Sequence, residues 1–292
     1  MKGLKNNTLQ GVFEWFCSSI SGVYDEREAR SVGQIVFEEL YAITPVMFAM
    51  DKSRRMTESD IVNLYRIIKK LNTGIPVQHI TGKGYFRDLV LRVNGDVLIP
   101  RSETEELVQW IVEDFANAKH TGPLTIWDIG TGSGAIAVSL AAELDNTQVW
   151  ASDVSEKALA TAKENSDANG QHIRFFLNDI LGDALPDEKF DVIVSNPPYI
   201  RLSEKPLMRN NVLDHEPHTA LFVPDEDPLL FYRAIGQVGL KLLNPAGKVY
   251  LEINEALGLE IRQLYESMGY VQVEVRKDLP GKNRFVKASL PV

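Results

Sequence analysis

The chain has 292 residues, of which 44% are hydrophobic, and its formal net charge is −9. This length permits one large domain or two smaller ones, and the acidic balance argues against a binder of naked nucleic acid. No apolar run has the length of a transmembrane helix and the first ten residues lack a signal-peptide core, so we expect no membrane segment and a cytoplasmic protein. The single cysteine excludes an internal disulfide, and no cluster of cysteine, histidine and carboxylate residues has metal-site spacing, so no metal is expected.

Residues 1–85 are expected to form a small helical domain. Apolar residues recur at helical spacing over residues 12–20, 35–40 and 61–67, and the sequence TESD at residues 57–60 supplies capping groups for the last helix. Nothing in this segment has catalytic spacing. It fits a bundle that recognises a substrate, which is the role we assign, and equally a cap that only stabilises its neighbour.

Residues 86–104 are expected to form a β-hairpin linker. Two β-rich runs at residues 85–93 and 96–100 flank Asn94 and Gly95, and Asn-Gly between such runs is the strongest short hairpin signal. The linker leads into a helix expected over residues 107–118. Ser102 followed by Glu105 matches a capping box for that helix.

Residues 105–292 are expected to form a Rossmann-like α/β domain. Strands alternate with helices, which implies a mostly parallel sheet with crossover connections. No helix separates the last two strands, so one of them should run antiparallel. Strands are expected over residues 125–129, 148–151, 172–177, 190–194, 248–253, 271–276 and 284–290, and helices over residues 135–144, 155–170, 229–243 and 257–268.

A glycine-rich loop, DIGTGSG, follows the first strand of this domain. Glycines let such a loop turn tightly and let its backbone N–H groups approach a ligand. The loop lacks the G-x-x-G tail of the dinucleotide fingerprint, which makes a nicotinamide cofactor the weaker interpretation. The acidic first residue suits a cationic amino-acid group better than a diphosphate. The candidate cofactor contacts are Asp128, Gly130, Thr131, Gly132, Ser133 and Gly134.

Two further carboxylates follow the next two strands. Asp153, about twenty residues past the glycine loop, is placed to accept both hydroxyls of a ribose. Asp179 is placed for an adenine amino group, although a helix cap explains this residue equally well. Its neighbour Ile180 and, after the fourth strand, Asn196 are further candidate cofactor contacts. A set of strand-end carboxylates of this kind indicates S-adenosylmethionine as the cofactor.

The fourth strand ends in a rigid corner, Asn196-Pro197-Pro198-Tyr199. A planar amino group offers two N–H donors and needs two acceptors in its plane. Asn196 supplies a side-chain oxygen, and Pro198 restricts Pro197 to an extended backbone that aims its carbonyl outward. Tyr199 offers a face for stacking. The corner therefore indicates binding of a carboxamide or of an adenine amino group.

These motifs together resemble the protein-glutamine N5-methyltransferases that modify peptide chain release factors. The resemblance covers residues 76–290 and rests on PVQHITG, VLIPRSETEELV, DIGTGSGAIAV, SNPPYI, DHEPHTAL and KDLPGKNRF. It implies methyl transfer from S-adenosylmethionine to the glutamine of the release factors' Gly-Gly-Gln loop. The cofactor loop falls on Gly130 to Gly134, the ribose acid on Asp153, and the catalytic and substrate motif on Asn196 to Tyr199, with Arg101 as a further substrate contact.

The chain departs from the family pattern at three positions. Ser102 stands where proline is usual, Ile180 where an aromatic residue is frequent, and Asn254 where glycine is usual.

Two alternative functions remain beside the main hypothesis. One is an amino-group methyltransferase acting on ribosomal RNA or DNA, which would need a positive surface for a flipped base. The other is a non-catalytic partner-binding module.

Overall fold

The computed structural model describes residues 3–116, 122–182, 184–208 and 210–292, and these divide into two compact units. The first runs up to Lys83 and includes α9 (Asn210–His215), and the second contains the rest of the chain from Gly84 onward. Within these residues, no helix is long and apolar enough to cross a bilayer.

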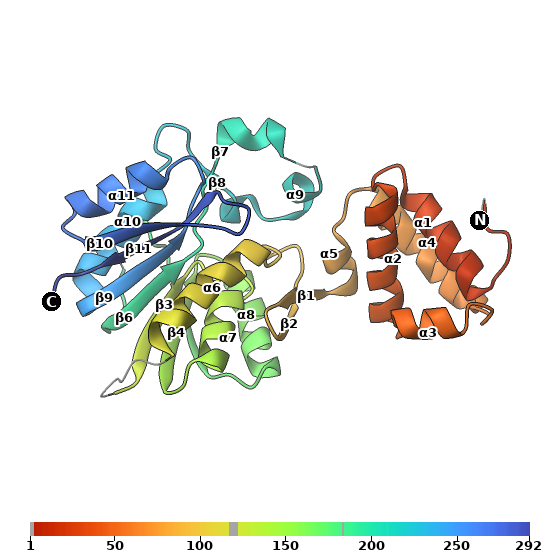
Figure 1. Ribbon diagram of the computed structural model, residues 1–292, viewed down its shortest axis with the longest axis horizontal. Coiled ribbons are helices and arrows are strands. Elements are labelled where there is room, and N and C mark those ends of the chain that lie inside the picture. The colour runs from red at the N-terminus through yellow and green to blue at the C-terminus, as the bar shows by residue number, and fades with distance from the viewer. Residues whose placement is uncertain (1–2, 117–121, 183, 209) are drawn as a thin grey trace. The chain divides into compact units, whose positions relative to one another are not determined.

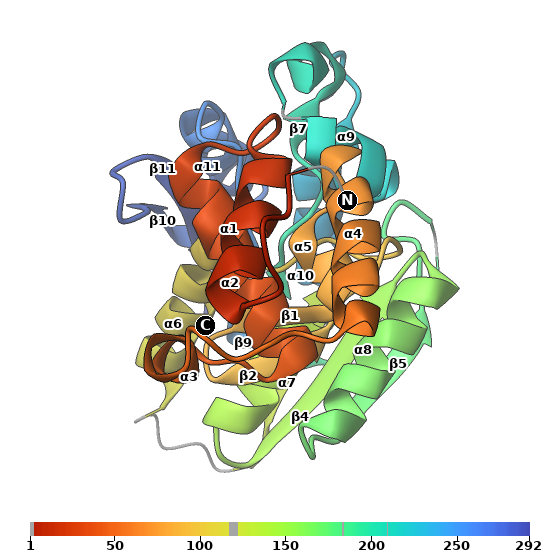
Figure 2. The same ribbon diagram turned by 90° about the vertical axis from the view of Figure 1, so that its right-hand side faces the viewer.

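The first unit is a bundle of helices, as the apolar periodicity of the sequence predicted. Helices α1, α2 and α4 pack side by side around a core of Phe, Leu, Ile and Val side chains (Figures 1 and 2). The predicted cap is confirmed, since Thr57 and Asp60 form a reciprocal capping box at the start of α4. The helices are α1 (Leu9–Ile20), α2 (Glu26–Tyr41), α3 (Pro45–Met50), α4 (Glu58–Asn72) and α5 (Val77–Thr81).

Helix α9 joins this bundle although more than a hundred residues separate it from the other helices in sequence. The ring nitrogen Nε2 of His215 lies 3.2 Å from the carbonyl oxygen of Thr73. Local sequence patterns carry no signal for such a distant contact.

A β-hairpin is present, but it is not the expected one, because residues 96–100 form no strand and the two strands of the hairpin come earlier in the chain. The strands β1 (Lys83–Phe86) and β2 (Leu89–Arg92) are joined at Arg87, not at Asn94 and Gly95. Arg87 has a φ of 52°, and its backbone and side chain donate to the Glu105 carboxylate and carbonyl, which stabilises the turn. Asn94 instead accepts from the Asp96 N–H in a local turn after the hairpin.

The second unit is built on a seven-stranded sheet of order β10-β11-β9-β6-β3-β4-β5. Neighbouring strands from β9 to β5 pair in parallel, whereas β11 runs antiparallel to both β9 and β10, which confirms the predicted single antiparallel strand. The strands are β3 (Leu124–Ile129), β4 (Thr147–Asp153), β5 (Ile173–Leu177), β6 (Phe190–Ser195), β9 (Leu243–Glu252), β10 (Val271–Lys277) and β11 (Asn283–Ser289).

Helices cover both faces of this sheet, because successive strand side chains point to opposite faces. Ile126 belongs to the core that contains residues of α6 and α7, and the next residue, Trp127, to the core that contains residues of α10 and α11. Figure 1 shows these two pairs of helices on opposite sides of the sheet. Helix α8 lies beside α7 and contacts β4 and β5. The helices are α6 (Ser102–Phe115), α7 (Ala135–Glu143), α8 (Glu156–Ala168), α10 (Leu230–Leu242) and α11 (Gly258–Ser267).

Helix α6 begins five residues earlier than expected, and residues 117 and 118 of the expected helix lie outside the described residues.

The capping box predicted for the start of α6 was wrong. Arg101 occupies the cap position without a side-chain cap bond, and the Ser102 hydroxyl donates to the neighbouring Glu103. Glu105 accepts from the Arg87 N–H instead, so the hairpin turn takes the carboxylate that the motif assigned to the helix start.

The chain beyond the Asn-Pro-Pro-Tyr corner forms small elements that the sequence did not predict. They are β7 (Ile200–Arg201), the 3-10 helix η1 (Leu202–Leu207), the 3-10 helix η2 (His218–Ala220) and β8 (Phe222–Val223). Strands β7 and β8 pair in parallel. The carboxyl ends of β3, β4, β5 and β6 meet at one edge of the main sheet, which is the edge where open α/β sheets bind ligands.

Candidate functional site

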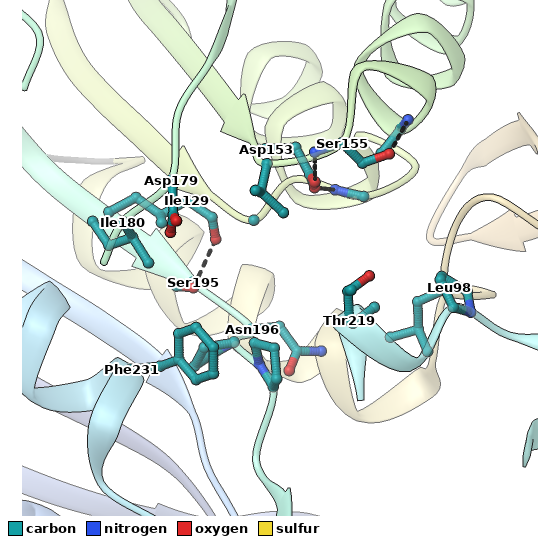
Figure 3. A pocket seen from close by; sticks show the side chains of 18 of the residues that line it. Leu98, Ile129, Asp153, Ser155, Asp179, Ile180, Ser195, Asn196, Thr219 and Phe231 are labelled. Atoms are coloured by element: carbon teal, nitrogen blue, oxygen red, sulfur yellow. Dashed lines mark hydrogen bonds between the residues drawn. The ribbon is translucent and has the colours of Figure 1, made fainter. Parts of the chain in front are cut away.

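A cavity of about 350 Å³ lies at the carboxyl ends of the parallel strands, and all its lining residues belong to the second unit. Figure 3 shows Asp153 and Ser155 on one side of it and Asn196 on the opposite side. Ile180 and Phe231 lie at one end, and Leu98 and Thr219 at the other. The cavity therefore joins the motifs that the sequence assigned to cofactor and substrate.

The glycine loop contributes backbone to the cavity wall. Gly130 and Gly132 line it with φ angles of 73° and 55°, and a Cβ added at either would meet no atom within 4 Å. A side chain there would project into open space that the bare backbone leaves for a ligand. Gly134 has another role, because a Cβ at this position would lie 3.1 Å from the Ala162 Cβ on α8.

Asp153 lies at the end of β4 and lines the cavity. Its Oδ2 accepts from the Gly132 N–H and its Oδ1 from the Ser155 N–H, both at 2.9 Å. Burial raises the pKa of Asp153, and these backbone bonds oppose the rise. Each carboxylate oxygen retains a lone pair, so Asp153 is held rigidly and can still accept hydroxyl groups of a ligand.

Asp128 is placed differently from the other acids, because it is completely buried beneath the loop and does not line the cavity. Its Oδ2 accepts from the Thr131 hydroxyl at 2.6 Å, and its Oδ1 has no hydrogen-bond partner among the described residues. Thr131 and Ser133 are also buried and do not line the cavity. An orphaned buried carboxylate oxygen is costly, and a cationic group bound above the loop would lower that cost.

Asp128 should make the stability of the protein depend on pH. Burial raises its pKa to about 7, so the folded state binds a proton that the unfolded state, with a pKa near 3.8, has already lost. Stability then falls as pH rises from 4 to 7, by up to about 1.4 kcal/mol for each unit of pKa difference. We therefore compare the melting temperatures of Asp128→Asn and the wild type without cofactor. The melting temperature of Asp128→Asn minus that of the wild type is expected to increase as pH rises from 4 to 7. A pH-independent difference would contradict this assignment.

Asp179 and Ile180 follow β5 and both line the cavity. The Asp179 Oδ1 accepts from the Leu181 N–H at 3.0 Å, so the carboxylate caps a local turn and remains exposed beside the cavity. Ile180 replaces the aromatic residue that is frequent there in the family pattern. The structure places Phe231 of α10 at the same end of the cavity (Figure 3), and no motif in the sequence pointed to it.

The Asn-Pro-Pro-Tyr corner forms the wall opposite Asp153. Asn196, Pro197 and Pro198 line the cavity directly after β6. The Ser195 hydroxyl donates to the Ile129 carbonyl at 2.7 Å, which ties the corner to the start of the glycine loop (Figure 3). The Asn196 Nδ2 donates to the Thr104 hydroxyl at 3.2 Å, whereas its Oδ1 accepts no hydrogen bond from the described residues. An unused acceptor thus lies at the cavity wall.

Tyr199 does not line the cavity, so the structure gives no support for its proposed stacking face. Its hydroxyl donates to the Glu252 Oε1 at 3.0 Å, and burial raises the pKa of Tyr199 well above its usual value. Asn254, which stands where the family usually has glycine, donates to the Tyr199 carbonyl at 3.2 Å. Tyr199 therefore holds the Asn-Pro-Pro-Tyr corner in place through Glu252 and Asn254, which do not line the cavity.

Arg101 also lies outside the cavity lining. Its guanidinium nitrogen Nη2 bonds both oxygens of the buried Glu216, at 2.7 and 2.8 Å. Pro217 and Thr219, which follow Glu216, do line the cavity. The ion pair thus holds one wall of the cavity in place, and the sequence could not reveal it because 115 residues separate the partners.

These features fit S-adenosylmethionine. The bare glycine backbone and the anchored Asp153 suit a nucleoside, and the unpartnered Asp128 oxygen beneath the loop suits the positive charge of an amino-acid group. None of the described His, Cys, Asp and Glu side chains gather in a group of three that would hold a metal ion.

Two protein-family models match this chain. Residues 107–214 match the methyltransferase small domain, and residues 12–82 match the PrmC N-terminal domain. The release factor glutamine methyltransferase of Flavobacterium psychrophilum is 39% identical over 274 residues, which cover 94% of this chain and 96% of that protein. The enzyme of the same name from Bacteroides thetaiotaomicron is 39% identical over 272 residues, with coverage of 93% and 96%.

Solved structures show the same fold at low sequence identity. A methyltransferase from Pyrococcus furiosus is 20% identical with a TM-score of 0.52, covering 79% of this chain and 99% of that one. The hMettl16 catalytic domain in complex with MAT2A 3'UTR hairpin 6 is 20% identical with a TM-score of 0.54, covering 70% and 75%. At this identity the likeness concerns the fold alone.

Proposed function

Because the chain belongs to the family of release factor glutamine methyltransferases, we propose that it methylates the side-chain amide nitrogen of the glutamine in the release factors' Gly-Gly-Gln loop, and that Asn196 and Pro197 hold that amide. The enzyme is an S-adenosylmethionine-dependent protein methyltransferase. The observation that supports the amide site best is the unused Asn196 Oδ1 at the wall of a cavity that also contains Asp153.

The chain's own groups have two tasks in this reaction. When bound, the cofactor supplies an activated methyl group on a sulfonium. The protein must align the acceptor nitrogen with that methyl group, and positioning of this kind contributes about 7 to 11 kcal/mol. A free carboxamide is a poor nucleophile because its lone pair is delocalised into the carbonyl. Acceptors at Asn196 and Pro197 stabilise the positive charge that develops on nitrogen, and the amide proton then leaves to solvent.

The helical unit is proposed to recognise the protein substrate. The cavity residues all belong to the second unit, and a single glutamine side chain offers too little surface to select one protein. A stable complex buries roughly 800 Å² of surface on each partner. A transient complex buries less, but still far more surface than a single side chain provides. Since release factors act in translation, the cytoplasm is the proposed location.

The alternatives are less well supported. A methyltransferase acting on naked RNA or DNA would need a basic surface, whereas this chain has a net charge of −9. Its relatives at 39% identity carry a protein-methylation name. A non-catalytic binding module would not require the glycine backbone, Asp153 and Asn196 to line one cavity.

A direct assay tests the substrate assignment. Purified protein, labelled S-adenosylmethionine and release factor should give label on the release factor, and a release factor with the loop glutamine changed to alanine should give none. Equal labelling of both proteins would place the methyl group elsewhere. Labelling of ribosomal RNA but not of release factor would favour the alternative.

The cofactor site gives a second prediction. Asp153→Ala should weaken S-adenosylmethionine binding by about 1.5 to 3 kcal/mol, the range for a hydrogen bond to a charged group. Gly132→Val should weaken it at least as much, because its side chain would occupy the cavity and strain a positive φ. Isothermal titration measures both, with Gly122→Val as a control outside the cavity. Unchanged affinity in both variants would mean that the loop is not the cofactor site.

A further inference from the structure

A buried chain of hydrogen bonds lies behind Asn196. It begins at Glu252, the last residue of β9, which is 1% exposed. The Thr104 hydroxyl donates to the Glu252 Oε2 at 2.6 Å, and the Tyr199 hydroxyl donates to the Oε1 at 3.0 Å. The Asn196 Nδ2 bonds the Thr104 oxygen at 3.2 Å. Neither Thr104 nor Glu252 lines the cavity.

The direction of these bonds determines which end of the Asn196 amide faces the cavity. Burial raises the pKa of Glu252, whereas the bonds that its two oxygens accept from Thr104 and Tyr199, and the positive charge of Arg284, favour the ionised carboxylate. A carboxylate only accepts hydrogen bonds, and a hydroxyl has one hydrogen to donate. Thr104 donates that hydrogen to Glu252, so only lone pairs of its oxygen remain for Asn196. The group that faces Thr104 must therefore be the N–H₂ of Asn196, and its oxygen must point elsewhere.

The opposite orientation would fail twice. The amide group of asparagine has nearly the same shape when its oxygen and nitrogen exchange places. Packing alone therefore does not determine which of the two atoms faces the cavity. Turned over, Asn196 would place its oxygen against the lone pairs of Thr104 and its N–H₂ toward the cavity. A substrate amide would then meet a donor where it needs an acceptor, and unpaired buried donors are costly.

We propose that Glu252 and Thr104 are positioning residues that hold the Asn196 amide with its oxygen toward the substrate, and that Glu252 fixes Tyr199 at the same time. The inference rests on the proposed function, since it assigns Asn196 the substrate amide. Sheet register brings the groups together, because Ser195 at the end of β6 pairs with Leu251 beside Glu252. Thr104 reaches the same point from the first turn of α6.

The first test removes the Thr104 hydroxyl while keeping the shape of its side chain. Thr104→Val should lower kcat for release factor methylation about tenfold, the scale of one lost hydrogen bond, with the affinity for S-adenosylmethionine unchanged. Thr104→Ser keeps the hydroxyl and should recover most of the activity. Thr125→Val is the matched control, because the Thr125 hydroxyl also donates to a carboxylate, that of Asp191, at the other end of the sheet. It should methylate at the wild-type rate.

A double-mutant cycle separates positioning from a general structural role. If Thr104 acts only through Asn196, then Thr104→Val should have no further effect on kcat in an Asn196→Ala background. An equal loss in both backgrounds, or an unchanged kcat in the single variant, would overturn the proposal. Should Thr104→Val fail to bind cofactor, Thr104→Ala takes its place in the same cycle. If the wild-type protein does not label release factor at all, the proposed function fails instead, so the two failures are distinguishable.

Discussion

Replacing Asn196 with alanine is expected to reduce turnover about 100-fold or more, by analogy with the loss of one preorganised polar group at a reacting centre. The Asn196 Oδ1 is an unused acceptor at the cavity wall, and the Nδ2 is held by Thr104. The side chain is therefore already oriented before substrate binds. Removing it leaves one N–H of the substrate amide without an acceptor and lets the nitrogen rotate away from the methyl group.

The measurement is single-turnover methylation of release factor at saturating cofactor, with cofactor affinity titrated in parallel. Affinity should change much less than turnover, since Asp153 and the glycine loop remain intact. Asn244→Ala is the matched control. Its Nδ2 bonds Asp191 at 2.8 Å near the start of β9, away from the carboxyl ends of the strands. Near-normal turnover of Asn196→Ala would remove Asn196 from the proposed mechanism.

The part of the site that could be predicted consists of residues at strand ends. Asp153 is the last residue of β4 and Asn196 directly follows β6, and the carboxyl ends of parallel strands meet at one edge. A strand pattern and a polar residue after it are both local signals. That is why the sheet and the polar residues at its ligand edge could be expected before any tertiary contact was known.

The residues that sequence reasoning missed act through distant partners. Glu252 was part of an ordinary apolar strand pattern, and nothing near it in sequence showed that its carboxylate bonds Thr104, 148 residues earlier. Glu216 is likewise recognisable only from its pair with Arg101. Such pairs depend on register and helix docking, which local periodicity does not encode.

Two local signals failed because a stronger tertiary contact overrode them. Asn94 and Gly95 have the composition of a hairpin turn, yet the chain turns at Arg87, whose side chain and backbone bond α6. The same contact takes Glu105 away from the predicted capping box. One arginine in a left-handed conformation thus accounts for both errors, since its bonds to the helix offset the strain of its positive φ.

A variant that begins at Gly84 tests the proposed role of the helical unit. The second unit starts at this residue and contains every residue that lines the cavity. We therefore expect the variant to fold and to bind S-adenosylmethionine, while methylation of intact release factor falls to background. Helix α9 would lose its partner carbonyl at Thr73, so its six residues are expected to show faster hydrogen exchange.

A short peptide carrying the Gly-Gly-Gln sequence separates lost recognition from lost catalysis. It presents the reacting amide without the protein surface around it, so the truncated and full-length proteins should methylate it at equally low rates. If the truncated protein aggregates or loses cofactor binding, the helices serve to stabilise the second unit. If it methylates intact release factor at the full rate, recognition resides in the second unit. Only the loss of protein methylation with peptide methylation retained agrees with a recognition domain, because the chemistry then persists where the wider contact is gone.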